Sequence, residues 1–178
     1  MTNPAHLLSL SRALLAPGAA WALWRDAAAM SFAIFAWVVV SDVLDGRVAR
    51  RRGDASEFGT LLDHGADCVF VTLVIATAAV LGLLPVALPV LIVAAFARYA
   101  LAARAAGGGF RGSQLGRVNG IAYFVLVFAV LIVRHFAPAP WAAALLQGAG
   151  WVLALSTLLL LVRRPPGGAL QPWPTRRS

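Results

Sequence analysis

The most regular feature of the chain is a series of six apolar runs, separated by short polar, glycine or proline segments. A helix needs about 20 apolar residues to cross roughly 30 Å of hydrocarbon, and each run is close to that length or longer. Strict alternation of apolar and polar positions does not recur, which disfavours a membrane β-barrel. The pattern therefore predicts an all-α integral membrane bundle of six transmembrane helices. The runs cover residues 5–24, 29–50, 57–84, 86–105, 115–136 and 140–162.

Composition and the end of the chain refine this architecture. Hydrophobic residues make up 61% of the 178 residues, well above the roughly half found in soluble domains. We therefore expect one transmembrane domain over residues 1–164. Residues 165–178 are rich in proline and glycine, a composition that cannot bury a core and is typical of a disordered tail, here a cytoplasmic one.

The arginines indicate how the bundle is oriented. The formal net charge is +8 and lysine is absent, so arginine carries all of the basic charge. Positive residues of short loops stay on the cytoplasmic side, and six spans leave only Arg25 and Arg134 outside when both termini are cytoplasmic. We expect a multi-pass protein of the cell (inner) membrane in that orientation. Topology and anionic lipid explain the charge, so no nucleic-acid partner is expected.

Four aspartates lie near the adjoining ends of the second and third runs. The first two are separated by three residues and the last two by four, spacings that place each pair on one face of a helix. Carboxylates at membrane depth need compensation, and divalent cations provide it. Oxygen ligands suit Mg²⁺ or Mn²⁺, and four carboxylates can hold two ions. These predicted metal ligands are Asp42, Asp45, Asp63 and Asp67.

The same segment carries a longer pattern of fixed residues at fixed spacing. It reads Asp42-x2-Asp45-Gly46-x2-Ala49-Arg50-x8-Gly59-x3-Asp63-x3-Asp67. This motif matches the signature of the CDP-alcohol phosphotransferase (CDP-alcohol phosphatidyltransferase) family at every defined position. The six runs and the short chain are also similar to the phosphatidyltransferase branch of that family.

The resemblance implies a reaction and a role for each motif residue. It implies attack of an alcohol hydroxyl on the β-phosphate of a CDP-linked lipid such as CDP-diacylglycerol, with release of CMP. It implies that the four aspartates bind metal and that Asp67 is also the general base. Gly46, Ala49 and Gly59 resemble residues that line the cytidine pocket, and Arg50 resembles one that contacts the pyrophosphate. Asp42 is expected at the CDP-lipid as well.

A second basic group lies between the fourth and fifth runs. The stretch from Arg111 to Arg117 resembles the family's basic segment that ends in Gly-Lys, with arginine in place of lysine. With Arg98 behind them, these arginines are expected to hold a phosphate on the acceptor alcohol. The expected acceptor is therefore a polyol phosphate such as glycerol 3-phosphate or inositol phosphate, with serine as an alternative.

Other interpretations remain open beside this one. Aspartates within a membrane also line cation pathways, so a cation transporter is the competing function. Arg12 is interpreted as an arginine that snorkels to the membrane surface at the end of a span, with an approach to the site as the alternative. His64 lies about 100° from the acidic face and is expected at a helix interface. The family resemblance implies a homodimer.

Overall fold

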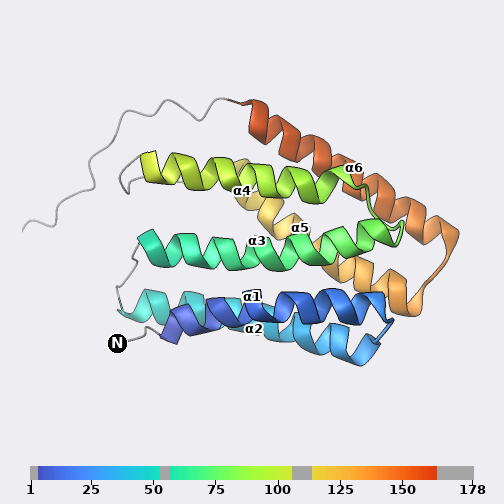
Figure 1. Ribbon diagram of the computed structural model, residues 1–178, viewed down its shortest axis with the longest axis horizontal. Coiled ribbons are helices and arrows are strands. Elements are labelled where there is room, and N and C mark those ends of the chain that lie inside the picture. The colour runs from blue at the N-terminus through green and yellow to red at the C-terminus, as the bar shows by residue number, and fades with distance from the viewer. Residues whose placement is uncertain (1–3, 53–56, 106–113, 164–178) are drawn as a thin grey trace, which may run out of the picture.

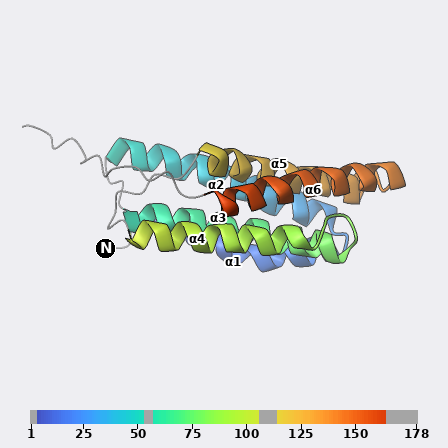
Figure 2. The same cartoon turned by 90° about the horizontal axis from the view of Figure 1, so that it is seen from above.

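The computed structural model is an elongated bundle of helices that run roughly parallel or antiparallel to one another (Figures 1 and 2). It describes the backbone of residues 4–52, 57–105 and 114–163, and the side chains in those ranges outside 4–6, 45–52, 57–58, 60 and 105. Within these ranges every regular element is a helix, which confirms the expected all-α fold. The helices are α1 (Pro4–Trp24), α2 (Ala28–Arg52), α3 (Glu57–Val80), α4 (Ala87–Ala105), α5 (Gln114–Phe136) and α6 (Pro140–Val162).

The helices match the apolar runs closely, with one difference at the end of α3. The third run continues to residue 84, yet the helix ends at Val80. Gly82 adopts a positive φ of 77°, and its N–H and that of Leu83 bond back to Ala79 and Ala78. Glycine takes this left-handed conformation without steric cost, so an apolar sequence here forms a turn rather than a further helical turn.

Five of the described helices are long and apolar enough to cross a membrane, namely α1, α3, α4, α5 and α6. The described apolar part of α2 is shorter and spans Ala28–Leu44. Large apolar side chains face outward, including Leu14 at 71% exposure and Val162 at 74%. Such surface is unfavourable in water and favourable against lipid. The fold is therefore that of a membrane helical bundle.

Helix α1 lies against both α2 and α3, and this trio forms one side of the bundle. Small residues on one face of α1, Ala16, Ala19 and Ala22, are buried, which allows close helix packing. Helix α6 packs against α4 and α5 on the other side. The hydroxyls of Tyr123 in α5 and Thr157 in α6 lie 2.5 Å apart, a polar contact within the apolar bundle.

Candidate functional site

Three aspartates meet at one end of the bundle. Asp42 comes from α2 and Asp63 and Asp67 come from α3, where their four-residue spacing puts them on one helical face. One carboxylate oxygen from each lies within 4.8 Å of the others. Their side chains are 53%, 32% and 25% exposed, so the cluster is open to the outside on one side. The two helices thus bring three like charges together.

Arg12 of α1 lies among these carboxylates. Its Nη1 donates to Asp67 Oδ1 at 2.5 Å and to Asp42 Oδ1 at 3.2 Å, and its Nη2 donates to Asp63 Oδ1. The Arg12 side chain is completely buried. The interpretation of Arg12 as a snorkelling arginine was therefore wrong. A guanidinium can stay inside when carboxylates supply both opposite charge and hydrogen-bond acceptors, so it has no need to reach the surface.

A second residue of α1 completes this face of the cluster. Ser9 is buried, and its hydroxyl donates to Asp63 Oδ1 at 3.3 Å while it accepts a hydrogen bond from Arg12 Nη2 at 3.3 Å. Sequence reasoning missed Ser9. The available signal was its position three residues before Arg12, which places both on one face of a helix that also carries an intramembrane charge.

The remaining motif residues are placed only in part. Gly59 lies in the first turn of α3 and is half-buried. The backbone of α2 continues as a helix through Asp45, Gly46, Ala49 and Arg50, whose side chains lie outside the described residues. Their roles in metal, cytidine and pyrophosphate binding stay predictions.

The described contacts do not bring the expected acceptor-binding arginines together. Arg98 Nη1 donates to the main-chain oxygens of Leu161 at 2.6 Å and Arg163 at 2.9 Å, where it binds the carboxyl end of α6. A cation is favourable at that end of a helix dipole. Arg117 is exposed in the first turn of α5, and Arg111 lies outside the described residues. A common phosphate site for the three stays a prediction.

His64 lies at a helix interface, as expected. Its ring centroid is 5.6 Å from that of Tyr99 in α4, and Tyr99 in turn lies 6.3 Å from Phe96. The exposed imidazole therefore lies against the neighbouring helix α4 through this ring contact.

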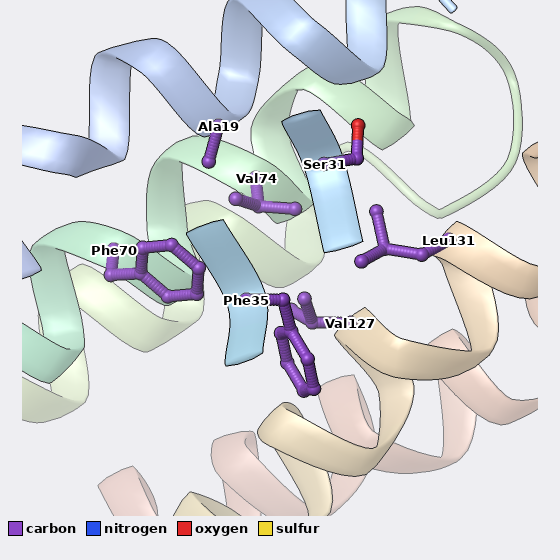
Figure 3. A pocket seen from close by; sticks show the side chains of 7 residues that line it. All are labelled: Ala19, Ser31, Phe35, Phe70, Val74, Val127 and Leu131. Atoms are coloured by element: carbon purple, nitrogen blue, oxygen red, sulfur yellow. The ribbon is translucent and has the colours of Figure 1, made fainter. Parts of the chain in front are cut away.

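A small hollow inside the bundle (Figure 3) is lined by residues other than the aspartates of the cluster. It lies among α1, α2, α3 and α5, and the Ser31 hydroxyl is the polar side-chain group on its wall. Such a surface offers neither charge nor metal ligands. It is lined by Ala19, Ser31, Phe35, Phe70, Val74, Val127 and Leu131.

The donor set of the cluster fits a divalent cation of the magnesium type. Asp42, Asp63 and Asp67 offer carboxylate oxygens, the ligands that Mg²⁺ and Mn²⁺ prefer, close enough to share an ion or a pair of ions. In the described residues the compensating cation is the Arg12 guanidinium, and it leaves an excess of negative charge. This excess and the open side of the cluster favour a bound divalent cation.

Comparisons with known proteins agree with this chemistry. A probable CMP-forming cardiolipin synthase of Drosophila melanogaster is 37% identical over 68 residues, which is 38% of this chain and 21% of the fly protein. No solved structure gives a significant match. The family model for CDP-alcohol phosphatidyltransferase matches residues 2–162, nearly the whole chain. The resemblance seen in the motif is thereby confirmed, and the chain, a multi-pass membrane protein, belongs to the CDP-alcohol phosphatidyltransferase family of transferase enzymes.

Proposed function

We propose that this protein transfers the phosphatidyl group of CDP-diacylglycerol to the hydroxyl of a small alcohol and releases CMP. The observation that carries the proposal is the convergence of Asp42, Asp63 and Asp67 from two helices within a chain of this family. In this reaction the acceptor oxygen forms a bond to the β-phosphorus while the bond from that phosphorus to the CMP oxygen breaks. The hydroxyl proton must leave at the same centre.

Asp42, Asp63 and Asp67, with Asp45 from the sequence motif, would hold the divalent ions, which we propose are two Mg²⁺ or Mn²⁺. When bound, such ions polarise the phosphate and stabilise the charge on the entering and leaving oxygens. Asp67 accepts the acceptor's hydroxyl proton on a carboxylate oxygen. Its side chain is 25% exposed and faces the cluster, so a substrate hydroxyl can reach it.

Further roles follow from the motif. Arg50 presents its guanidinium to the pyrophosphate, and Gly46, Ala49 and Gly59 let the backbone approach the cytidine. Arg98, Arg111 and Arg117 hold the acceptor's phosphate. The family signature supports the first set of roles, together with the position of Gly59 at the start of the helix that carries Asp63. The acceptor site is supported by the resemblance of the stretch from Arg111 to Arg117 to the family's basic segment.

The proposed acceptor is an alcohol that carries a phosphate. A polyol phosphate such as glycerol 3-phosphate or inositol phosphate suits the basic segment. The fly relative favours a second candidate, because its name specifies a reaction that makes cardiolipin and releases CMP. By atom balance such a reaction needs an acceptor that already contains a phosphatidylglycerol unit. Both candidates share a phosphate diester or monoester next to a free hydroxyl.

We further propose that α2 crosses the membrane as a sixth span and that both termini face the cytoplasm of a cell (inner) membrane. Helix α2 contains 25 residues, roughly 37 Å at 1.5 Å per residue, which is enough to span the hydrocarbon. The arginine distribution supports this orientation, in which the aspartate end would face the compartment where water-soluble cytidine is available. A homodimer is proposed from the family resemblance.

The decisive experiment measures CMP release by the purified protein in lipid vesicles. CDP-diacylglycerol is combined in turn with glycerol 3-phosphate, inositol phosphate, phosphatidylglycerol and serine, with Mg²⁺, Mn²⁺ or EDTA, and lipid products are identified by mass. We expect metal-dependent CMP release with a phosphate-bearing acceptor. The variants Asp67→Ala and Asp42→Asn should lose nearly all of it while retaining helical circular dichroism.

Two results would contradict the proposal. A retained rate in both variants would remove the aspartates from the reaction. Cation flux through vesicles without any CDP-lipid, abolished by the same substitutions, would instead establish the cation transporter that acidic residues in a membrane also permit.

A further inference from the structure

The position of Arg12 is unusual for a residue of a metal site. It comes from α1, whereas the three aspartates come from α2 and α3, so its guanidinium joins three helices at one point. It is fully buried and uses both of its terminal nitrogens on carboxylates. A fixed cation among the carboxylates affects metal binding whether or not it touches substrate.

Charge balance shows why the cluster needs such a cation. Three ionised carboxylates whose oxygens lie within 4.8 Å of one another repel strongly where water is scarce. With Arg12 included, the described groups sum to −2, from three negative charges and one positive charge. That sum is equal in magnitude and opposite in sign to the charge of one divalent ion. Arg12 therefore reduces the repulsion without cancelling the attraction for metal.

The packing of α1 explains how Arg12 is held. Helix α1 lies against both α2 and α3, and buried Ser9 bonds to both Arg12 and Asp63. Trp37 of α2 donates from its indole to the Ser11 hydroxyl at 3.2 Å, next to Arg12 in sequence. These contacts tie the first half of α1 to the helices that carry the acids.

We propose that Arg12 is a positioning residue that assembles the carboxylate cluster in the metal-free protein and gives up carboxylate oxygens when metal binds. This inference rests on the proposed function, since it takes Asp42, Asp63 and Asp67 as the metal ligands. It goes further because it assigns a role to α1, which lies outside the signature motif. Arg12 acts through the aspartates, and no contact with substrate is needed.

The test compares thermal unfolding of the wild type and Arg12→Gln in detergent micelles, each with EDTA and with saturating Mg²⁺. With EDTA the variant should unfold several degrees lower, because the carboxylates then lack a cation. With Mg²⁺ the difference should shrink by at least half, because the ion takes over that role. Manganese affinity, measured by electron paramagnetic resonance, should rise several-fold in the variant, since a competing positive charge is gone. Arg12→Lys keeps the charge, so its unfolding temperature and its manganese affinity should lie between those of the wild type and Arg12→Gln.

Arg98→Gln serves as the matched control. It also removes an arginine from a membrane helix, yet its described partners are main-chain oxygens of α6. Its unfolding temperature should fall equally with EDTA and Mg²⁺. If Arg12→Gln does not fold, Arg12→Gln combined with Asp63→Asn restores the charge sum and should recover the protein.

Each remaining outcome decides the matter. An equal fall of Arg12→Gln with EDTA and with Mg²⁺ would make Arg12 an ordinary structural ion pair and overturn the inference. Failure of the double variant to recover folding would do the same. If the wild type is stabilised by metal but releases no CMP, the proposed function fails while the role of Arg12 stands. If metal does not stabilise the wild type at all, both fail.

Discussion

The two ends of the bundle carry charged clusters of opposite character. At the end where α2 finishes and α3 begins, one buried arginine lies among three aspartates. At the other end Asp26, 56% exposed in the turn between α1 and α2, contacts Arg134 and His135 at the end of α5. The first cluster contains more carboxylates than basic side chains, whereas the second contains one carboxylate beside an arginine and a histidine. Only the first has the composition of a metal site.

The far cluster is better understood as a tie between helices. Asp26 has a φ of 58°, and its carboxylate lies 2.8 Å from His135 Nδ1, while His135 Nε2 lies 3.2 Å from the Ser31 hydroxyl. A serine, histidine and aspartate in this order also occur in nucleophilic triads. Ser31, however, is only 2% exposed and borders the apolar hollow of Figure 3. The contacts therefore fix the turn to α5 rather than prepare a nucleophile.

The largest expected difference between the ends is catalytic. Asp63→Asn should lower metal-dependent CMP release by about 100-fold or more, because it removes a proposed metal ligand. Asp26→Asn should change the rate by less than about twofold, as an exposed substitution away from the site does. Asparagine also tolerates the positive φ at this position. The test compares steady-state rates of CMP release by both variants at matched protein and lipid concentrations. Similar losses in the two variants would contradict the prediction that only the aspartate cluster takes part in the reaction.

An intermediate effect on stability is expected where α6 crosses the turn between α3 and α4. A Cβ at Gly150 would overlap the Pro85 ring and press on Leu84, whereas a Cβ at Gly148 would meet nothing within 4 Å. Gly150→Ala should therefore cost about 1–3 kcal/mol through overpacking. Gly148→Ala should be neutral or slightly stabilising. Thermal unfolding in micelles measures both, and because this turn is remote from the aspartates the loss should not depend on Mg²⁺.

The smallest effect is expected from Arg134→Gln. Arg134 Nε lies 3.6 Å from Asp26 Oδ1, too long for a hydrogen bond, and the carboxylate is more than half exposed. Such ion pairs contribute about 0–1 kcal/mol and weaken with salt. The unfolding temperature should fall little, and less at high ionic strength. A loss as large as that of Arg12→Gln in EDTA would show that the far cluster is also a major centre of stability.

The apolar runs were sufficient to predict the helices and the motif was sufficient to predict the family, because both depend on local periodicity and fixed spacing. The four-residue interval between Asp63 and Asp67 places them on one helical face in any structure that keeps α3 helical. The local sequence also indicated the true end of α3, since Gly82 and Pro85 both oppose continuation of the helix beyond Val80. The third run was nevertheless drawn to residue 84, because the sequence stays apolar up to that position.

What the sequence by itself determined about this protein was its set of membrane helices, its acidic motif and hence its family. The tertiary structure alone decided which residue balances the acids. Arg12 in α1 and Asp67 in α3 are separated by 55 positions. Periodicity within one helix does not predict which residues of another helix it will contact, and this contact forms only when α1 packs against α2 and α3. A charge inside a membrane must have a partner, but which partner depends on helix packing, and packing is set by buried surfaces contributed by the whole chain.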